Sequence, residues 1–171
     1  MSNTFQAQHK FDPAAMRHYL NGELSVLHCH HYTALFTQLA NDAKLLKGAQ
    51  QMTEAAAETM FPPLQKYFKD NQIIDKKIRA EAASAYFAYI GLGKVQIDLE
   101  AGKAIMTHSH IDEGWKKKWG NAAKSINFIG QGFLMAAAAA IENSTPSAYN
   151  VDETESIACG KNASKFTITK K

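Results

Sequence analysis

The sequence predicts a single α+β domain in which a four-stranded antiparallel sheet packs against several helices. Alanine occurs 27 times and valine three times in the 171 residues, a composition that favours helices over strands. The alternation of hydrophobic and polar residues that is typical of strands is confined to two regions, near residues 95–107 and 149–169. Helical segments precede and separate these regions, so we expect two hairpins that join into one sheet.

The N-terminus is expected to be a flexible arm over residues 1–12, followed by one domain over residues 13–171. Asp12 and Pro13 fit a helix N-cap followed by proline in the first helical position, and Asn21–Gly22 fits the end of that short helix. Its hydrophobic face would comprise Met16, Tyr19 and Leu20.

Three longer helices are predicted next. Residues 27–43 form an amphipathic helix with a buried stripe at i, i+3, i+4 and i+7, comprising Tyr32, Leu35, Phe36 and Leu39. A helix over 49–60 is interrupted at Pro62–Pro63, with residues 64–68 continuing the same element through a kink. A helix over 75–90 ends at Gly91-Leu92-Gly93, where glycines permit positive φ.

The C-terminal half contains the predicted sheet. Val95–Leu99 is expected to pair with Ala104–His108, and Tyr149–Ser156 with Lys165–Thr169. Between the hairpins, residues 115–125 form a polar, lysine-rich connection, and residues 128–142 form an alanine-rich helix.

Composition and charge exclude several classes of protein. The net charge of +3 and the pI of about 8.8 are too small a basic excess for a typical nucleic-acid-binding protein. No apolar run reaches the length of a membrane span, and residues 1–10 have no signal-peptide core, so a cytoplasmic location is expected. Cys29 and Cys159 are expected to be free thiols in a reducing compartment.

Three segments carry a resemblance to a known family: Gly91-Leu92-Gly93-Lys94-Val95, Gly132-Phe133-Leu134, and residues 151–160 followed by Phe166-Thr167-Ile168. In this order and spacing the chain resembles the 4-vinyl reductase domain family over residues 75–169. The resemblance implies helices beside a four-stranded antiparallel sheet, with a hydrophobic pocket for a small molecule or hydrocarbon chain. It also implies a homodimer. The fold is similar to that of transport-particle tethering subunits that hold a fatty acyl chain, and family members are associated with (bacterio)chlorophyll biosynthesis and with sensing of aromatic compounds.

The sequence departs from this family at three positions. Many members carry cysteines near the start of the long helix and twice in the last hairpin, where this chain has Asn127, Ser156 and Ser164. Serine hydroxyls are poor ligands for soft divalent metals, so a zinc site of the family type is not expected. Cys159 lies at a different position and does not replace the missing thiolates.

Two groups of histidines form a second candidate site. His28 and His31 are three residues apart at a helix start, and His108 and His110 are two residues apart at a strand end, so each pair shares a face. Four imidazoles from two elements would suit a divalent transition metal, and we expect the two pairs to converge. The alternatives are solvated histidines, or neutral imidazoles that hydrogen-bond a ligand directly.

Seven residues are predicted to line the ligand pocket, namely Tyr32, Phe36, Tyr86, Tyr89, Phe128, Gly132 and Phe133. At helical spacing the same residues would also suit an ordinary core.

These features favour a protein that binds a small hydrophobic or aromatic ligand between helices and sheet, with a tetrapyrrole-like molecule as one candidate. The alternative is an enzyme acting on such a ligand through a histidine-based metal or acid–base site. A third class is an interaction module that uses the fold only to dimerise. The sequence has none of the common nucleophile, phosphate-binding or zinc-protease motifs, and no catalytic residue is assigned.

Overall fold

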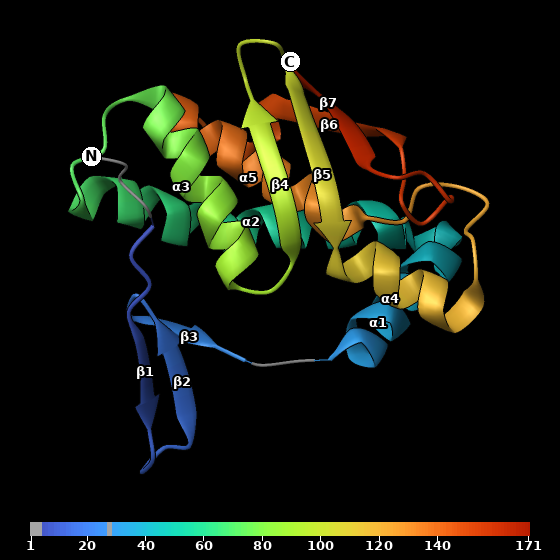
Figure 1. Ribbon diagram of the computed structural model, residues 1–171, viewed down its shortest axis with the longest axis horizontal. Coiled ribbons are helices and arrows are strands. Elements are labelled where there is room, and N and C mark those ends of the chain that lie inside the picture. Colours follow the sequence, from blue (N-terminus) through green and yellow to red (C-terminus); the bar gives the residue numbers. More distant parts are fainter. Residues whose placement is uncertain (1–4, 27–28) are drawn as a thin grey trace.

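The computed structural model describes residues 5–26 and 29–171, and it confirms the α+β architecture (Figure 1). The main sheet is antiparallel, with the order β4-β5-β7-β6. Its strands are β4 (Gly93–Asp98), β5 (Lys103–Ser109), β6 (Tyr149–Glu155) and β7 (Ser164–Lys170). The helices of the described residues are α1 (His30–Asp42), α2 (Gly48–Asp70), α3 (Lys76–Tyr89), α4 (His110–Trp119) and α5 (Phe128–Glu142), with short 3-10 turns η1 (Lys44–Leu46) and η2 (Pro146–Ala148). None of these helices combines the length and the hydrophobicity that a membrane span requires.

Both predicted hairpins are confirmed. Val95 lies opposite Met106 in the β4–β5 pair, and Val151 lies opposite Ile168 in the β6–β7 pair. The turn into β4 depends on Gly93, which has a φ of 138° and whose Cα–H faces the partner strand so closely that a Cβ would lie 2.0 Å from a carbonyl oxygen of β5. Gly93, the first residue of β4, therefore allows both the turn and the close strand contact.

The core is built around α5, which lies between the sheet and α2. Eleven of its fifteen residues are buried, so this helix is hydrophobic around its whole circumference, as expected for a central element. Its alanines allow α2 on one side and the sheet on the other to approach closely. The predicted bounds of this helix, 128–142, are confirmed.

Gly132 is a point of close approach between α5 and α2. A Cβ at this position would lie 2.2 Å from the Thr53 carbonyl oxygen and 2.7 Å from the Ala56 Cβ. The residues in the first turns of α5 are therefore small because α2 packs closely against them.

We expect Gly132→Ala to lower the free energy of unfolding by about 2 kcal/mol, because the added methyl group must push two helices apart. Chemical denaturation monitored by circular dichroism measures the change. Gln131→Ala, at the partly buried neighbouring position, is the control and should change stability much less. Equal stability of the two variants would contradict the close packing.

The helix predicted after Asp12 is wrong. Residues 9–25 form a three-stranded antiparallel sheet of β1 (His9–Asp12), β2 (Arg17–Leu20) and β3 (Glu23–Ser25). The Asp12 carboxylate accepts hydrogen bonds from the backbone N–H groups of Ala14 and Ala15, at 2.9 and 3.2 Å, and so caps a turn instead of a helix. Met16 then adopts a φ of 52°, which reverses the chain into β2.

The face of α1 that was predicted to be buried is exposed. Thr33, Ala34 and Thr37 are the buried residues of this helix, and they face α4 and α2. The predicted stripe lies on the outer side, with exposed fractions of 56% for Tyr32, 45% for Leu35, 42% for Phe36 and 55% for Leu39.

Two helix boundaries also differ from the prediction. The helix α2 is one element up to Asp70, which confirms that residues 64–68 continue the same helix, whereas the interruption expected at Pro62 and Pro63 is absent. The helix α4 begins at His110, directly after β5, where Ser109 caps it by accepting a hydrogen bond from the Asp112 N–H at 3.1 Å.

Candidate functional site

A group of buried polar side chains joins α4, α5 and the β6–β7 hairpin. We call it the Asp112 cluster; it comprises Ser109, Asp112, Asn127, Glu153, Ser156 and Ser164. Asp112 stands in the first turn of α4 and Asn127 caps α5 by accepting a hydrogen bond from the Gly130 N–H at 2.9 Å. The cluster therefore connects the starts of two helices to one end of the sheet.

The Asp112 carboxylate is the acceptor at the centre of this cluster. The Asn127 amide donates a hydrogen bond to it at 2.8 Å, and the hydroxyls of Ser156 and Ser164 lie at 3.5 Å from its two oxygens. Burial raises the pKa of this carboxyl, while the hydrogen bonds from Ser109, Asn127 and Ser156 act in the opposite direction. Asp112 is fully buried, so protein donors stabilise it in place of water.

Glu153 is the second carboxyl of the cluster. Both of its carboxylate oxygens are buried and make no hydrogen bond of normal geometry within the described residues. Burial, followed by the nearby negative charge of Asp112, raises the pKa of Glu153 to about 7. The side chain therefore holds a proton more tightly than an ordinary glutamate.

Asn127, Ser156 and Ser164, the three positions at which the resemblance to the 4-vinyl reductase family implies cysteines, come together in this cluster, because all three contact Asp112. Their chemistry does not fit zinc. The Asn127 nitrogen and the two hydroxyls point donors at a carboxylate, whereas a zinc site needs thiolate or imidazole acceptors around the metal. Hydrogen bonds to Asp112 connect the starts of α4 and α5 to the β6–β7 hairpin.

Sequence reasoning did not assign Asp112 and Glu153 to this cluster. The available signal was the three-residue spacing from Ser109, which is typical of a capped helix start, and the position of Glu153 three residues before Ser156.

The two histidine groups meet, but through a different residue from those predicted. The ring of His30, at the start of α1, lies 4.0 Å between centroids from the ring of His110, at the start of α4. His31 and His108 are exposed, and His28 lies outside the described residues. Within the described ranges, no three His, Cys, Asp or Glu side chains are placed to hold a metal ion. The structure therefore brings together a pair of imidazoles in the α1–α4 contact.

Cys29 precedes this pair as the N-cap residue of α1 and is exposed. The backbone N–H groups of Tyr32 and His31 lower the pKa of its thiol. Cys159 is also a free thiol, in the β6–β7 turn region.

The residues predicted to line the pocket fall into three separate groups. Tyr32 and Phe36 contact each other on the outer face of α1, with ring centroids 4.6 Å apart. Tyr86 and Tyr89 on α3 pack around Phe5, at 5.6 and 5.9 Å. The remaining three, Phe128, Gly132 and Phe133, are buried on α5.

Phe133 is the member of this last group with a described aromatic partner. Its ring lies 4.5 Å between centroids from the ring of Phe87 on α3, and both side chains are almost completely buried. Because α3 packs on both β4 and α5, this aromatic pair lies where helices and sheet meet.

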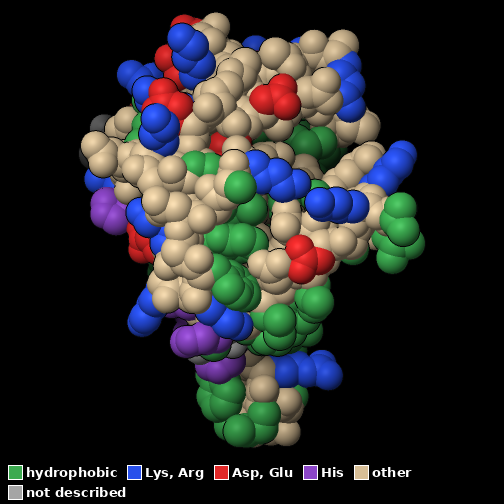
Figure 2. Space-filling view, turned by 90° about the vertical axis from the view of Figure 1, so that its right-hand side faces the viewer, with side chains coloured by type: hydrophobic (Ala, Val, Ile, Leu, Met, Phe, Trp, Pro, Cys, Tyr) green, Lys and Arg blue, Asp and Glu red, His purple; other side chains and the backbone are tan. Residues whose placement is uncertain are grey.

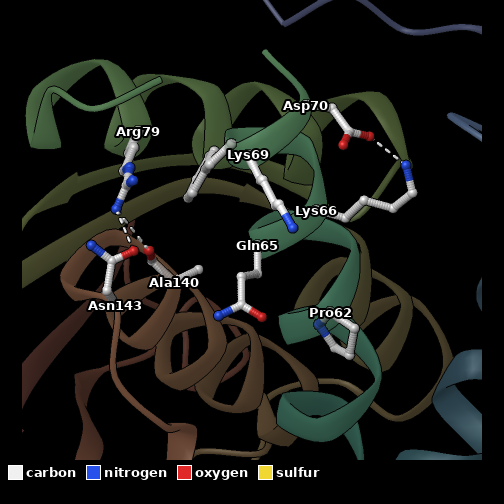
Figure 3. A pocket seen from close by; sticks show the side chains of 9 residues that line it. Pro62, Gln65, Lys66, Lys69, Asp70, Arg79, Ala140 and Asn143 are labelled. Carbon is white, nitrogen blue, oxygen red and sulfur yellow. Dashed lines mark hydrogen bonds and ion pairs between the residues drawn. The ribbon is translucent and has the colours of Figure 1, made fainter. Parts of the chain in front are cut away.

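The described residues form surface clefts, two of which lie next to α2. The larger one, of about 740 Å³, lies between α2, α3 and the end of α5, and Figure 3 shows that polar side chains surround it. Arg79 donates hydrogen bonds to the carbonyl oxygens of Ala140 and Ile141 and to the Asn143 side chain, at 3.3, 3.0 and 2.9 Å, so its charge stabilises the C-terminal end of α5. Lys66 is paired with Asp70. This cleft is not the predicted hydrophobic pocket.

The smaller cleft, of about 400 Å³, lies between the N-terminal sheet and the C-terminal half of α2. Phe5, Leu20, Tyr67 and Tyr86 contribute its apolar side chains. Burial, followed by the negative charge of Glu23, raises the pKa of Tyr86.

Comparison with solved structures identifies the fold. The chain is similar to the phenol-responsive sensory domain of the transcription activator PoxR, crystallised with phenol, with a TM-score of 0.76 at 13% identity over 95% of this chain and 84% of that domain. It is also similar to a vinyl-4-reductase family protein from Methanocaldococcus jannaschii, with a TM-score of 0.55 at 16% identity over 85% of this chain and 83% of the other. No family model and no curated protein matches the sequence.

Proposed function

Because the chain has the fold of a 4-vinyl reductase-like domain, we propose that it binds a small hydrophobic or aromatic molecule between its helices and its sheet. The observation that carries this proposal is the similarity over 95% of the chain to a sensory domain that was crystallised with phenol. In this role the protein acts as a carrier, a sensor or an accessory factor for another protein.

The interior around Phe87 and Phe133 supports this proposal. The two rings lie at the junction of α3, α5 and the sheet, and the surrounding core is formed by apolar side chains. Such an environment favours a flat apolar ligand that can pack edge to face against aromatic rings. The surface clefts are lined by charged and amide groups as well as rings, which makes them less suitable for a hydrophobic molecule.

A thermal-shift measurement with phenol and with dodecanoate tests the proposal and distinguishes an aromatic ligand from a hydrocarbon chain. A ligand at about 100 times its dissociation constant stabilises the folded state by about 2.7 kcal/mol, and we expect a rise of roughly 5–10 °C in Tm for a domain of this size. Phe133→Trp should abolish the rise by filling the interior. Tyr67→Ala, in the smaller surface cleft, should retain it.

Two results would contradict the proposed site. One is the absence of any rise in Tm with either compound at millimolar concentration. The other is a rise that is lost in Tyr67→Ala and kept in Phe133→Trp, which would move the ligand to the cleft beside the N-terminal sheet.

A further inference from the structure

The larger surface cleft contains a positive charge that no acidic side chain neutralises. Arg79 is partly buried at the edge of this cleft and forms no ion pair with any carboxylate that the structure describes. Withdrawing a charged side chain from water without an opposite charge is costly. The carbonyl oxygens at the end of α5 offset part of this cost, because they carry only partial negative charges.

The guanidinium of Arg79 is fixed in position and keeps two donors unused. Its Nε donates a hydrogen bond to the Ile73 carbonyl oxygen at 2.8 Å, and its Nη1 donates to three acceptors at the C-terminal end of α5. Its Cζ lies 5.4 Å from the centroid of the Phe68 ring. The remaining nitrogen, Nη2, donates to no acceptor in the described part of the chain. The two N–H groups of this nitrogen are therefore available to a ligand, in a rigid plane.

Further donors reach the same cleft from α2. Lys69 is exposed and has no ion pair among the described residues, whereas the nearby Lys66 is paired with Asp70. Figure 3 shows the side chains of Lys69 and Gln65 extending into the space that Arg79 borders from the other side. Two unpaired cations and an amide therefore surround one hollow from two different helices.

We propose that this cleft binds the phosphate group of a small phosphorylated molecule. Lys66, Lys69 and Arg79 line it together with one carboxylate, Asp70, which leaves a net charge of +2. A phosphate monoester carries a charge of about −1.5 to −2 at neutral pH and offers three acceptor oxygens, so it matches both the charge and the donors. Arginine and lysine are the side chains that most often bind phosphate, arginine through two parallel hydrogen bonds.

The shape of the cleft favours a small molecule over a polyanion. Its volume of about 740 Å³ lies within the range of roughly 300–1,000 Å³ that is typical of small-molecule sites. Pro62, Phe68 and Ala140 give the lining an apolar part that suits the organic portion of the ligand. A nucleic acid would need a basic surface that extends beyond one cleft. On the side of α4, Figure 2 shows Lys and Arg side chains spread over the surface among acidic ones.

Titration of the full chain with inorganic phosphate, followed by amide NMR spectroscopy, tests the site. We expect saturable changes in the side-chain resonances of Gln65, Arg79 and Asn143, beyond those caused by sodium chloride at equal ionic strength. Lys69→Ala should weaken the Kd for phosphate at least about 10-fold, because it removes one of the two unpaired cations. Lys69→Arg, which retains the charge, should bind phosphate about as tightly as the wild type.

Lys124→Ala is the matched control, since Lys124 is also exposed but lies between α4 and α5, before the opposite end of α5 from the cleft. This variant loses the same charge and should keep the wild-type Kd. Changes no larger than those caused by sodium chloride would overturn the inference. An equal loss of affinity in Lys69→Ala and Lys124→Ala would indicate general charge attraction and overturn it as well. Acetate that binds as tightly as phosphate would exclude phosphate as the preferred group.

This cleft is separate from the interior around Phe87 and Phe133, and none of its lining residues except Phe68 belongs to the almost fully buried aromatic side chains. The phosphate titration uses neither phenol nor dodecanoate. Its failure would therefore leave the proposed binding of a hydrophobic molecule unaffected, and failure of that proposal would leave the phosphate site unaffected.

Discussion

Asp112→Ala should lower the free energy of unfolding by about 3 kcal/mol at pH 7, a fall in Tm of roughly 6–12 °C. The Asp112 side chain is fully buried and accepts the 2.8 Å hydrogen bond from the Asn127 amide nitrogen. The oxygen of the same amide caps α5 by accepting a hydrogen bond from the Gly130 N–H. Removing the carboxylate leaves this buried amide and the hydroxyls of Ser156 and Ser164 without their central acceptor. The loss of a buried acceptor costs more than the net contribution of its hydrogen bonds.

Asp152→Ala, at an exposed position of β6, is the control for this experiment and should change stability by less than about 0.5 kcal/mol. Guanidinium denaturation of both variants measures the difference. If Asp112→Ala changed the free energy of unfolding as little as Asp152→Ala, the cluster would not hold α4, α5 and the hairpin together.

Glu153→Gln should stabilise the protein at pH 8 by up to about 3 kcal/mol and leave stability at pH 4.5 nearly unchanged. In the folded chain the pKa of Glu153 is raised from 4.5 to about 7 by burial and by the charge of Asp112. Between these two values the unfolded glutamate loses its proton while the folded one keeps it. The free energy that protonated Glu153 contributes to folding is therefore fully present below pH 4.5. It declines as the pH rises to about 7 and stays low above that.

A neutral glutamine has no proton to lose, so the stability of Glu153→Gln should depend less on pH between 4.5 and 7. The control is Glu155→Gln, two residues further along the same strand. Glu155 is partly exposed, and the Nζ of Lys165 lies 2.9 Å from its Oε1, which lowers the pKa of this carboxyl. Replacement of Glu155 should therefore not produce stabilisation at pH 8. Unfolding curves at half-unit pH intervals provide the comparison. Parallel pH profiles for wild type and Glu153→Gln would contradict the raised pKa.

The sequence predicts the C-terminal half of the fold well, because its signals are local. The two hairpins follow from alternation and glycine turns, and α5 follows from a long apolar, alanine-rich run. The N-terminal sheet was missed because Asp12 and Pro13 fit a helix start as well as a turn, and three- or four-residue strands provide almost no alternation.

The error at α1 has a different cause. Its hydrophobic period correctly predicts a helix, but periodicity alone does not distinguish a face that packs on the core from one that remains uncovered. The opposite face of α1 packs on the domain because Thr33, Ala34 and Thr37 are small enough to lie against α4 and α2. Side-chain size on both faces would have been the useful signal.

The candidate site was only partly predictable. The resemblance to the 4-vinyl reductase family indicated Asn127, Ser156 and Ser164 as equivalent positions, and the structure brings these three together. Asp112 joins them from 15 to 52 residues away in the sequence, and contacts over such separations leave no periodic pattern. The histidine prediction likewise identified the two segments that meet but not the pair of residues in contact. That contact is made by His30 and His110.

Native mass spectrometry of the full chain with phenol and with dodecanoate tests the central claim most directly, because it reports the mass of any bound molecule per copy. The proposed function predicts one retained molecule of phenol or of dodecanoate on each wild-type chain, and its loss in Phe133→Trp. A folded protein that retains neither compound at millimolar concentration, or that binds the same number of molecules after Phe133→Trp, would contradict it.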